Sequence, residues 1–311
     1  MSALRVTATG ATGLIGRRLI AALQARGAEV TVLSRDPARA RAELGDIDAA
    51  PWEPLSEPAP AEALAGRDAV VHLAGEPVAQ RWSASARRAI RDSRVVGTRN
   101  LIAGLGSVEE PGRGRRPDTL ISSSAIGYYG SRGEEPLDED APSGADFLAR
   151  VCVEWEAEAA MARALGMRVV QVRTGVVLDR QGGALAKMLA PFRLGLGGPV
   201  ASGRQYVSWI HVEDLVALML AALADERWTG PINATAPEPV NNRNFSRALG
   251  AALHRPALLP VPGLMLHMLY GEMAGIMTTG ARVVPAKPLV LGYQFSHPAL
   301  PEALRTALAA G

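Results

Sequence analysis

Cysteine and lysine are almost missing from this chain of 311 residues. The single cysteine, Cys152, cannot form a disulfide within the chain or build a thiolate cage around a metal, so we expect a reducing compartment and no metal site. The only lysines are Lys187 and Lys287. A mechanism that needs an ammonium group in the first half of the chain is therefore excluded.

Long apolar runs and a surplus of one charge are missing as well. No stretch reaches the roughly 18 apolar residues of a membrane-spanning helix, and the N-terminal residues show no basic segment followed by an apolar core. The 33 basic and 31 acidic residues are interspersed, and the basic cluster of Arg113, Arg115 and Arg116 lies in a Gly/Pro loop typical of a solvated connection. We therefore expect a cytoplasmic protein that binds neither membranes nor nucleic acid.

The chain alternates apolar segments typical of buried strands with amphipathic segments typical of helices. Strands are predicted at residues 4–9, 28–34, 69–75, 119–124, 168–177 and 231–234, and helices at 14–26, 37–44, 83–105, 146–165 and 242–253, with a strand end and a helix over 209–224. This order predicts an α/β protein with a doubly wound parallel Rossmann sheet and a smaller C-terminal substrate-binding lobe. We expect residues 1–178 and 208–230 to form the sheet domain, and residues 179–207 and 231–311 to form the lobe.

Three glycines join the first predicted strand to the first predicted helix. Gly10, Gly13 and Gly16 have the spacing G-x-x-G-x-x-G. Such spacing lets the backbone turn tightly, approach a pyrophosphate and pack the helix against the strand, with the helix N-terminus facing the anion. An ordinary glycine turn is the alternative, but the strand, glycine loop and helix together predict a dinucleotide site.

The residues after the second strand indicate which dinucleotide binds. Proteins that prefer NAD place a carboxylate there for the ribose hydroxyls, whereas this chain has Ser34 and Arg35. A guanidinium can pair with a 2′-phosphate and stack on adenine, which favours NADP(H). The alternative is that Arg35 is a solvated surface residue and that Asp36 binds the ribose.

Five motifs in a fixed order extend this interpretation over nearly the whole chain. They are Gly10–Gly16, His72-Leu73-Ala74-Gly75-Glu76, Ser122-Ser123-Ser124-Ala125-Ile126-Gly127-Tyr128-Tyr129-Gly130, Arg173-Thr174-Gly175-Val176-Val177-Leu178 and Trp209-Ile210-His211-Val212-Glu213-Asp214-Leu215. With these motifs the chain resembles the extended short-chain dehydrogenase/reductase superfamily. Within it the chain is similar to an atypical branch of the NAD-dependent epimerase, or nucleotide-sugar epimerase-like, family.

The resemblance implies a set of cofactor-binding residues. The pyrophosphate loop would comprise Gly10, Thr12, Gly13, Leu14, Ile15 and Gly16, the 2′-phosphate position Ser34 and Arg35, and the adenine and ribose path Leu73, Ala74 and Gly75. Arg94 stands where many members carry an asparagine near the nicotinamide ribose, although a helix-surface arginine is an equal alternative. The backbone from Thr174 to Val177 would support the nicotinamide carboxamide.

The resemblance fails at the residues that normally carry the chemistry. The superfamily uses a tyrosine as general acid or base, a lysine four residues later that lowers its pKa, and a serine that orients the substrate. Ser124 matches the serine, but Leu148 and Cys152 stand at the other two positions. Tyr128 is a candidate acid in their place, with a structural or substrate-contacting role as the alternative. Cys152 is interpreted as a small buried hydrophobe rather than a nucleophile.

Other polar residues of the motifs are assigned structural roles. We expect His72 to be a satisfied core residue, His211 to be structural, and Asp214 to cap the helix that follows it. The remaining histidines have no metal-ligand spacing. The methionine-rich stretch around Met265 to Met277 is interpreted as packing, with an apolar substrate lid as the alternative.

Two functions follow from the sequence. The first is an NADP(H)-dependent oxidoreductase or epimerase-like enzyme for a small carbonyl or hydroxyl substrate, such as a sugar derivative. The second is a non-catalytic NADP(H)-binding regulatory or sensor protein, which the missing tyrosine and lysine suggest. Because dimers of the family commonly pair helices such as 83–105 and 146–165, a homodimer is also a hypothesis.

Overall fold

Short apolar segments form a central parallel sheet in the computed structural model, which describes residues 3–109 and 114–309. Its seven strands are β1 (Arg5–Thr9), β2 (Glu29–Ser34), β3 (Asp48–Pro51), β4 (Ala69–His72), β5 (Thr119–Ala125), β7 (Arg168–Thr174) and β11 (Gly230–Ala234). Their order is β11-β7-β5-β4-β1-β2-β3, and all neighbouring pairs are parallel. The predicted sheet is confirmed.

The basic cluster predicted in a Gly/Pro loop is described only in part. Arg113 lies outside the described residues, whereas Arg116 donates to the carbonyl oxygens of Leu105 and Leu165.

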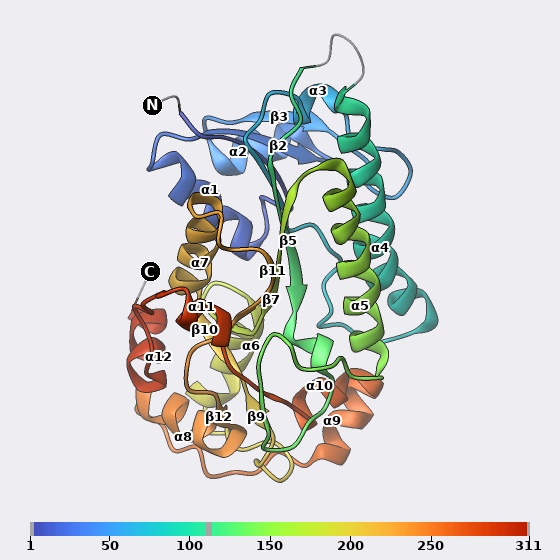
Figure 1. Ribbon diagram of the computed structural model, residues 1–311. Helices are drawn as coiled ribbons and strands as arrows, with labels where there is room; N and C mark the ends of the chain where they lie inside the picture. Colours follow the sequence, from blue (N-terminus) through green and yellow to red (C-terminus); the bar gives the residue numbers. More distant parts are fainter. Residues whose placement is uncertain (1–2, 110–113, 310–311) are drawn as a thin grey trace.

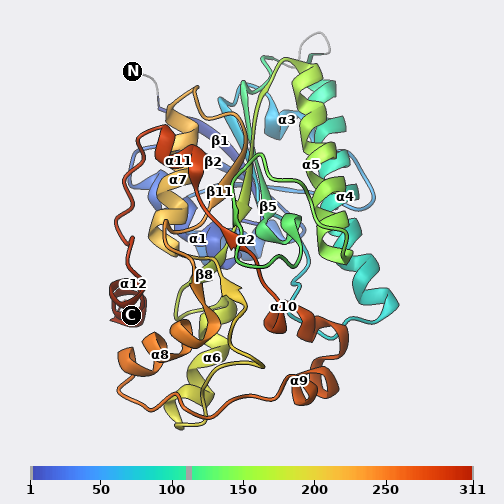
Figure 2. The same ribbon diagram turned by 60° about the horizontal axis from the view of Figure 1, so that its bottom comes forward.

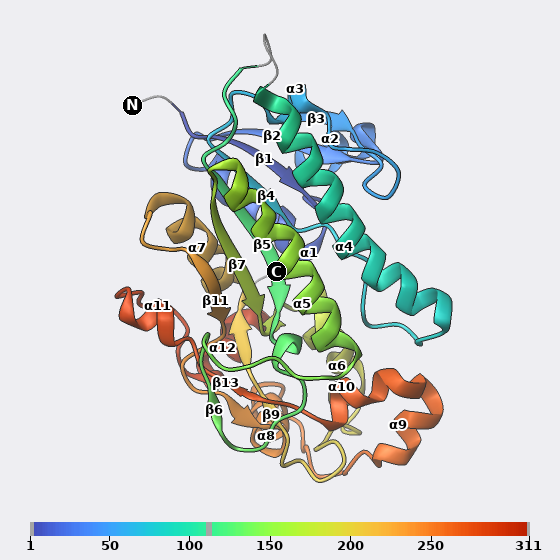
Figure 3. The ribbon, with the colours of Figure 1, turned by 45° about the vertical axis from the view of Figure 1, so that its right-hand side comes forward.

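Helices cover both faces of the sheet (Figure 1). One face carries α1 (Leu14–Gln24), α2 (Pro37–Leu44) and α7 (Val212–Ala224), which share a core with β1, β2 and β7. The other carries α3 (Ala61–Leu64), α4 (Ala84–Gly106) and α5 (Phe147–Ala160), and α4 and α5 lie side by side across it (Figure 3). The fold is doubly wound because the central strands are apolar on both faces, as in β4, where all four residues are buried.

The direction of the chain reverses beside β1. After β1 the chain adds β2 and β3 on one side, and it then returns to place β4 on the other side. The loops that follow β1 and β4 therefore diverge at the carboxyl ends of these strands, where open α/β sheets bind their ligands. The glycine loop follows β1, and Leu73, Ala74 and Gly75 follow β4.

Most of the remaining elements gather beyond the carboxyl ends of β5 and β7 (Figure 2). β8 (Val176–Leu178), α6 (Gly183–Arg193), β10 (Trp209–His211), α8 (Asn242–Ala252) and α12 (Leu300–Ala309) share a separate apolar core. Around them lie β6 (Pro136–Leu137), β9 (Tyr206–Val207), β12 (Val240–Asn241), α9 (Gly263–Tyr270), α10 (Gly275–Thr278) and β13 (Arg282–Val283), with the 3₁₀ turns η2 (Ile126–Tyr129) and η4 (Gly271–Ala274). Elsewhere, α11 (Ala286–Val290) packs against β11, and the 3₁₀ turns η1 (Ser107–Glu109) and η3 (Met161–Leu165) follow α4 and α5 before β5 and β7 begin.

Apart from shifts of one to three residues at the ends of elements, three boundaries differ from those expected. The strand predicted over 168–177 is divided into β7 and β8 at Gly175, where a Cβ would lie 2.5 Å from the Ser208 carbonyl oxygen. The helix predicted over 146–165 is α5 followed by η3, with Asp146 as its N-cap. β11 joins the central sheet across the boundary drawn at residue 230, so the sheet includes residues 231–234. No helix among the described residues is long and apolar enough to span a membrane.

Candidate functional site

The glycine loop between β1 and α1 requires the glycines at its first and last positions. Gly10 has φ of +66°, and a Cβ on it would lie 2.6 Å from the carbonyl carbon of Leu73. A Cβ on Gly16 would lie 2.4 Å from the Gly10 carbonyl oxygen. Any side chain at either position would displace backbone, so these glycines bring the ends of β1, α1 and β4 into contact.

The N-terminus of α1 is open to an anion. Gly13 is the N-cap residue, no side chain caps the helix, and its first turn contains no acidic residue. The first N–H groups of a helix have no intrahelical partner and carry a partial positive charge. Thr12, Leu14 and Ile15 around this end are half-buried and Gly13 is exposed, so the end is accessible.

A buried hydrogen-bond chain fixes the backbone after β4. The Thr9 Oγ1 accepts from the backbone N–H groups of Leu73 and Ala74, so its own hydrogen is free for the His72 Nδ1 at 2.7 Å. The other ring nitrogen of His72 lies 3.1 Å from the Thr98 Oγ1. Burial lowers the pKa of His72 to about 4, which keeps the ring neutral. The interpretation of His72 as a satisfied core residue is confirmed.

The end of β2 presents a free guanidinium. Arg35 is exposed and makes no ion pair within residues 3–109 and 114–309. Asp36, the alternative ribose ligand, is engaged as the N-cap of α2 and accepts from the backbone N–H of Arg39 at 3.0 Å. The Ser34 Oγ bonds to the backbone of Asp36 at 3.1 Å.

Arg94 folds inward from α4 toward the end of β4. Its guanidinium donates to the carbonyl oxygens of Glu76 and Ile90 and lies 5.2 Å from the ring centroid of Trp155. A Cβ on Gly75 would lie 3.2 Å from its Cζ. Burial lowers the pKa of Arg94. The alternative of a helix-surface arginine does not describe this partly buried group.

Ser124 lies in a buried polar network rather than in an open site. Its Oγ donates to the Glu156 Oε1 at 2.6 Å, and Ser124 is 4% exposed. Glu156 forms a two-pronged ion pair with Arg173, with N···O distances of 2.8 and 2.9 Å. Burial alone would lower the pKa of Arg173, but its hydrogen bonds and attraction to Glu156 outweigh burial and raise it. Glu156 lies one turn beyond Cys152 on α5, and this helical spacing is the sequence signal that could have indicated its place in the network.

The two tyrosines after Ser124 have different environments. Tyr129 is fully buried, donates from its hydroxyl to the Asn233 Oδ1 at 2.7 Å and accepts from Arg173 at 2.8 Å. Burial raises the pKa of Tyr129 to about 12, which makes it a poor acid. Tyr128 is only partly buried, and the Arg173 Cζ lies 3.5 Å from its ring centroid. Arg132, four residues after Tyr128, donates to the carbonyl oxygens of Tyr129 and Pro142.

Leu148 and Cys152 lie beside the loop that follows Ser124. A Cβ on Gly127 would lie 3.5 Å from the Leu148 Cβ and 3.9 Å from the Cys152 Sγ. Burial raises the pKa of the Cys152 thiol to about 12, so it is protonated at neutral pH. The interpretation of Cys152 as a buried hydrophobe is confirmed, and neither side chain can replace the missing tyrosine and lysine. Val177, which the resemblance places at the nicotinamide carboxamide, is half-buried in β8.

The role expected of Asp214 is wrong. α7 begins at Val212, so its N-cap is His211, whose ring accepts from the Glu213 N–H at 3.3 Å. Asp214 lies within the first turn and accepts from the backbone N–H groups of Ser296 and His297 at 2.8 and 2.9 Å. It therefore anchors the C-terminal segment instead of capping the helix.

The methionine-rich stretch is only partly buried. Met273 is buried, whereas Met265 and Met268 are exposed and do not pack as expected.

Comparison with known proteins extends over the whole chain. The model of the NAD dependent epimerase/dehydratase family matches residues 6–233, and that of a domain of unknown function (DUF1731) matches residues 261–307. The chloroplastic SDR39U1 homolog of Arabidopsis thaliana, an epimerase family protein, is 40% identical over 307 residues, or 99% of this chain and 87% of that protein.

Two solved structures have the same fold and substantial identity. The human epimerase family protein SDR39U1 (isoform 2), crystallised with NADPH, has a TM-score of 0.85 and 34% identity, and the match covers 98% of this chain and 100% of that one. The nucleoside-diphosphate sugar epimerase of Corynebacterium glutamicum has a TM-score of 0.79 and 35% identity, over 99% of this chain and 58% of that one.

Proposed function

The chain belongs to the NAD dependent epimerase/dehydratase family, and we propose that it is an NADP(H)-binding oxidoreductase or epimerase-like enzyme for a small carbonyl or hydroxyl substrate, such as a sugar derivative. The observation that carries the proposal is the β1–α1 loop, in which Gly10 and Gly16 leave no room for a Cβ beside an uncapped helix end. This cradle fits a pyrophosphate. The NADPH in the human relative supports the same cofactor.

The cofactor residues divide into three groups along this crevice. Gly10, Thr12, Gly13, Leu14, Ile15 and Gly16 would hold the pyrophosphate, Leu73, Ala74 and Gly75 the adenine and ribose, and Val177 with Arg94 the nicotinamide half. Arg35 and Ser34 would bind the 2′-phosphate. The exposure of Arg35 and the capping role of Asp36 support the phosphate over a bare ribose. Bound NADP(H) would supply or accept a hydride.

Ser124 and Tyr128 would face the substrate in different roles. Because the Ser124 hydroxyl already donates to Glu156, its oxygen can only accept a hydrogen bond, which suits a substrate hydroxyl. Tyr128 is the remaining O–H donor of the pair, and the Arg173 guanidinium against its ring fixes its orientation. In this proposal Ser124 orients the substrate and Tyr128 exchanges a proton with it.

The chemistry on α5 favours a second candidate. Leu148 cannot transfer a proton, and the Cys152 thiol stays protonated at neutral pH. Ser124 donates to a carboxylate that is already paired with Arg173, an arrangement that is present without any substrate. These features suit a non-catalytic NADP(H)-binding regulatory or sensor protein.

Cofactor preference is tested with Arg35→Ala and, as a control with the same charge change, Arg26→Ala at the exposed far end of α1. Charge-assisted hydrogen bonds contribute about 1.5–3 kcal/mol, so NADPH affinity should fall roughly 10- to 150-fold in Arg35→Ala while NADH affinity stays constant. Fluorescence titration gives both constants. An unchanged or equally reduced affinity for the two cofactors would contradict the 2′-phosphate role.

Catalysis is tested by following NADPH absorbance with a library of aldehydes and ketones, and by following the conversion of nucleotide sugars by NMR, because an epimerase regenerates its cofactor and leaves the absorbance unchanged. Turnover that is lost in Ser124→Ala and Tyr128→Phe, with NADPH affinity unchanged, supports the enzyme. Tyr270→Phe in the exposed part of the lobe is the control for the loss of a hydroxyl. Tight NADPH binding without turnover of any substrate supports the sensor instead.

A further inference from the structure

Three side chains from distant parts of the sequence converge at the start of α7. His211 ends β10, Glu213 lies in the first turn of α7, and His297 lies between α11 and α12. The Glu213 Oε2 is 2.9 Å from the His297 Nε2 and 3.9 Å from the His211 Nδ1. The centroids of the two imidazole rings are 3.9 Å apart. One ligand atom from each residue lies within 4.8 Å of the other two.

We propose that His211, Glu213 and His297 bind a zinc ion. Two imidazole nitrogens and one carboxylate oxygen form a donor set that zinc uses in proteins, with a fourth position left for water. Ligand atoms around tetrahedral zinc lie roughly 3.3 Å apart, given bond lengths of about 2.0–2.1 Å. The two separations from the Glu213 Oε2, 2.9 and 3.9 Å, lie on either side of this value, and the Glu213 side chain is 62% exposed.

The two histidines are held in place by other contacts. β10 pairs with β8, and His211 opposes Leu178 in the register. The backbone N–H of His297 is fixed by the Asp214 carboxylate, which also accepts from Ser296. A ligand set that is positioned before the metal arrives loses little conformational freedom on binding.

Unpartnered nitrogens provide a second, independent observation. The Nε2 of His211 and the Nδ1 of His297 are buried and make no hydrogen bond within the part of the chain that the structure describes. The one bond that the ring of His211 does make, from the Glu213 N–H, is long at 3.3 Å. The nitrogens that face Glu213 are the His211 Nδ1 and the His297 Nε2, so these unpartnered atoms are the second nitrogen of each ring. Buried polar groups without partners are rare, so each ring keeps a nitrogen that can still take a ligand or a water.

The surrounding charges favour a cation. Asp214 accepts from the backbone N–H of His297 at 2.9 Å, and the Glu213 carboxylate belongs to the cluster itself. Arg18, the guanidinium beside Glu213, is paired with Asp179 at 3.1 Å. These groups comprise three carboxylates and one guanidinium, so their net charge is negative.

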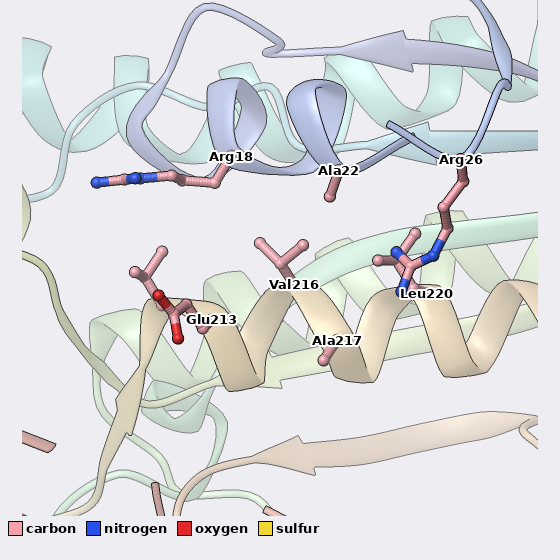
Figure 4. A pocket seen from close by; sticks show the side chains of 8 residues that line it. Arg18, Ala22, Arg26, Glu213, Val216, Ala217 and Leu220 are labelled. Atoms are coloured by element: carbon pink, nitrogen blue, oxygen red, sulfur yellow. The ribbon is translucent and has the colours of Figure 1, made fainter. Parts of the chain in front are cut away.

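The site is accessible from solvent. Glu213 lines a groove of about 260 Å³ between α1 and α7. Figure 4 shows Glu213 and Arg18 at one end of this groove, with Val216 and Ala217 further along α7. A hydrated ion can reach the carboxylate through this groove. Bound zinc would join the segment that carries His297 to the start of α7.

The experiment measures zinc binding to untagged protein by competition with a chromogenic chelator. We expect one zinc ion per chain, a rise in Tm with zinc, and no comparable effect of Mg²⁺, which prefers oxygen ligands. Glu213→Gln and His297→Ala should each weaken zinc binding at least tenfold. His254→Ala and His267→Ala, which remove exposed histidines outside the cluster, should leave it unchanged.

Two results would overturn the proposal. One is the absence of stoichiometric zinc binding to the folded wild-type chain at micromolar free zinc. The other is binding that persists unchanged in both Glu213→Gln and His297→Ala. Circular dichroism confirms that each variant is folded, and Glu213→Gln changes an exposed side chain, so a loss of binding there does not reflect unfolding.

Discussion

At the scale of single residues, Glu156 determines the character of the site. It lies one helical turn beyond Cys152 and holds Ser124 and Arg173 at once. The side chains of Glu156 and Arg173 are 10% and 3% exposed, so neither charge can be compensated by water. A buried ion pair of this kind adds little to stability as a pair, but losing one partner leaves an uncompensated charge.

Glu156→Gln should therefore be strongly destabilising. Removal of one partner of a buried pair costs roughly 3–5 kcal/mol in the free energy of unfolding. The matched control is Glu154→Gln on the same helix, whose pair with Arg91 is about 42% exposed on each side and should cost less than about 1 kcal/mol. Denaturant unfolding measures both. Equal losses of unfolding free energy in the two variants would contradict the larger penalty expected for the buried pair.

His72 gives the protein a defined sensitivity to acid. Its pKa is about 4 in the folded state and about 6.5 when unfolded, so above pH 6.5 it contributes no pH dependence. As the pH falls from 6.5 to 4, the unfolded state takes up the proton first, and stability declines by about 1.4 kcal/mol per pH unit, or about 3 kcal/mol in all.

His72→Asn, which cannot be protonated, should lack this contribution. The difference in unfolding free energy between wild type and variant should be constant above pH 6.5 and should change steadily in disfavour of wild type below it. The carboxylates titrate in both proteins and cancel in the difference. A difference that stays constant from pH 7 to pH 4 would contradict the neutral buried imidazole.

At the scale of elements, the β1–α1 loop depends on a contact that no other residue allows. Gly16→Ala would bring a Cβ within 2.4 Å of the Gly10 oxygen and 2.6 Å of the Ala11 oxygen. The loop must then open, which we expect to cost about 1–3 kcal/mol and to weaken NADPH binding at least tenfold. Calorimetric titration and thermal unfolding measure the two effects.

The control for this substitution is Gly106→Ala. Gly106 ends α4, has no atom of the described residues within 4 Å of its missing Cβ and is not in a left-handed conformation. Alanine there should be neutral or stabilising by up to about 1 kcal/mol, because it is the better helix former. If Gly16→Ala behaved like Gly106→Ala, the close packing of the loop would be irrelevant to the cofactor.

At the scale of the whole molecule, Asp214 connects the C-terminal segment to the sheet domain. Its carboxylate accepts two backbone N–H groups from residues 82 and 83 positions later, and the Tyr293 hydroxyl lies 3.3 Å from its carbonyl oxygen. Asp214→Ala leaves these partly buried donors without their partner, at a cost of about 1 kcal/mol. Hydrogen exchange of the Ser296 and His297 amides should accelerate at least tenfold.

Asp225, which pairs with the exposed Arg227 at the end of α7, provides the control. Asp225→Ala should leave exchange at Ser296 and His297 unchanged. If Asp214→Ala left those amides as protected as in wild type, the segment would be held by its apolar contacts alone.

The sequence by itself determined the elements whose signals are local. Alternating apolar segments, the glycine spacing and the arginine after β2 all lie within short windows, where chain geometry dictates structure. These signals were sufficient for the doubly wound sheet and for the absence of the usual tyrosine and lysine. They also sufficed for the burial of His72, because that residue interrupts an otherwise apolar strand.

Only the tertiary structure decided which side chains meet. Glu156 approaches Ser124 across 32 positions, Asp214 approaches His297 across 83, and Glu213 approaches His297 across 84. Such contacts depend on how helices dock on the sheet and how the C-terminal segment returns to it, and residue spacing carries no record of either. For the same reason the sequence predicts a helix cap at Asp214 and does not reveal the cluster of His211, Glu213 and His297.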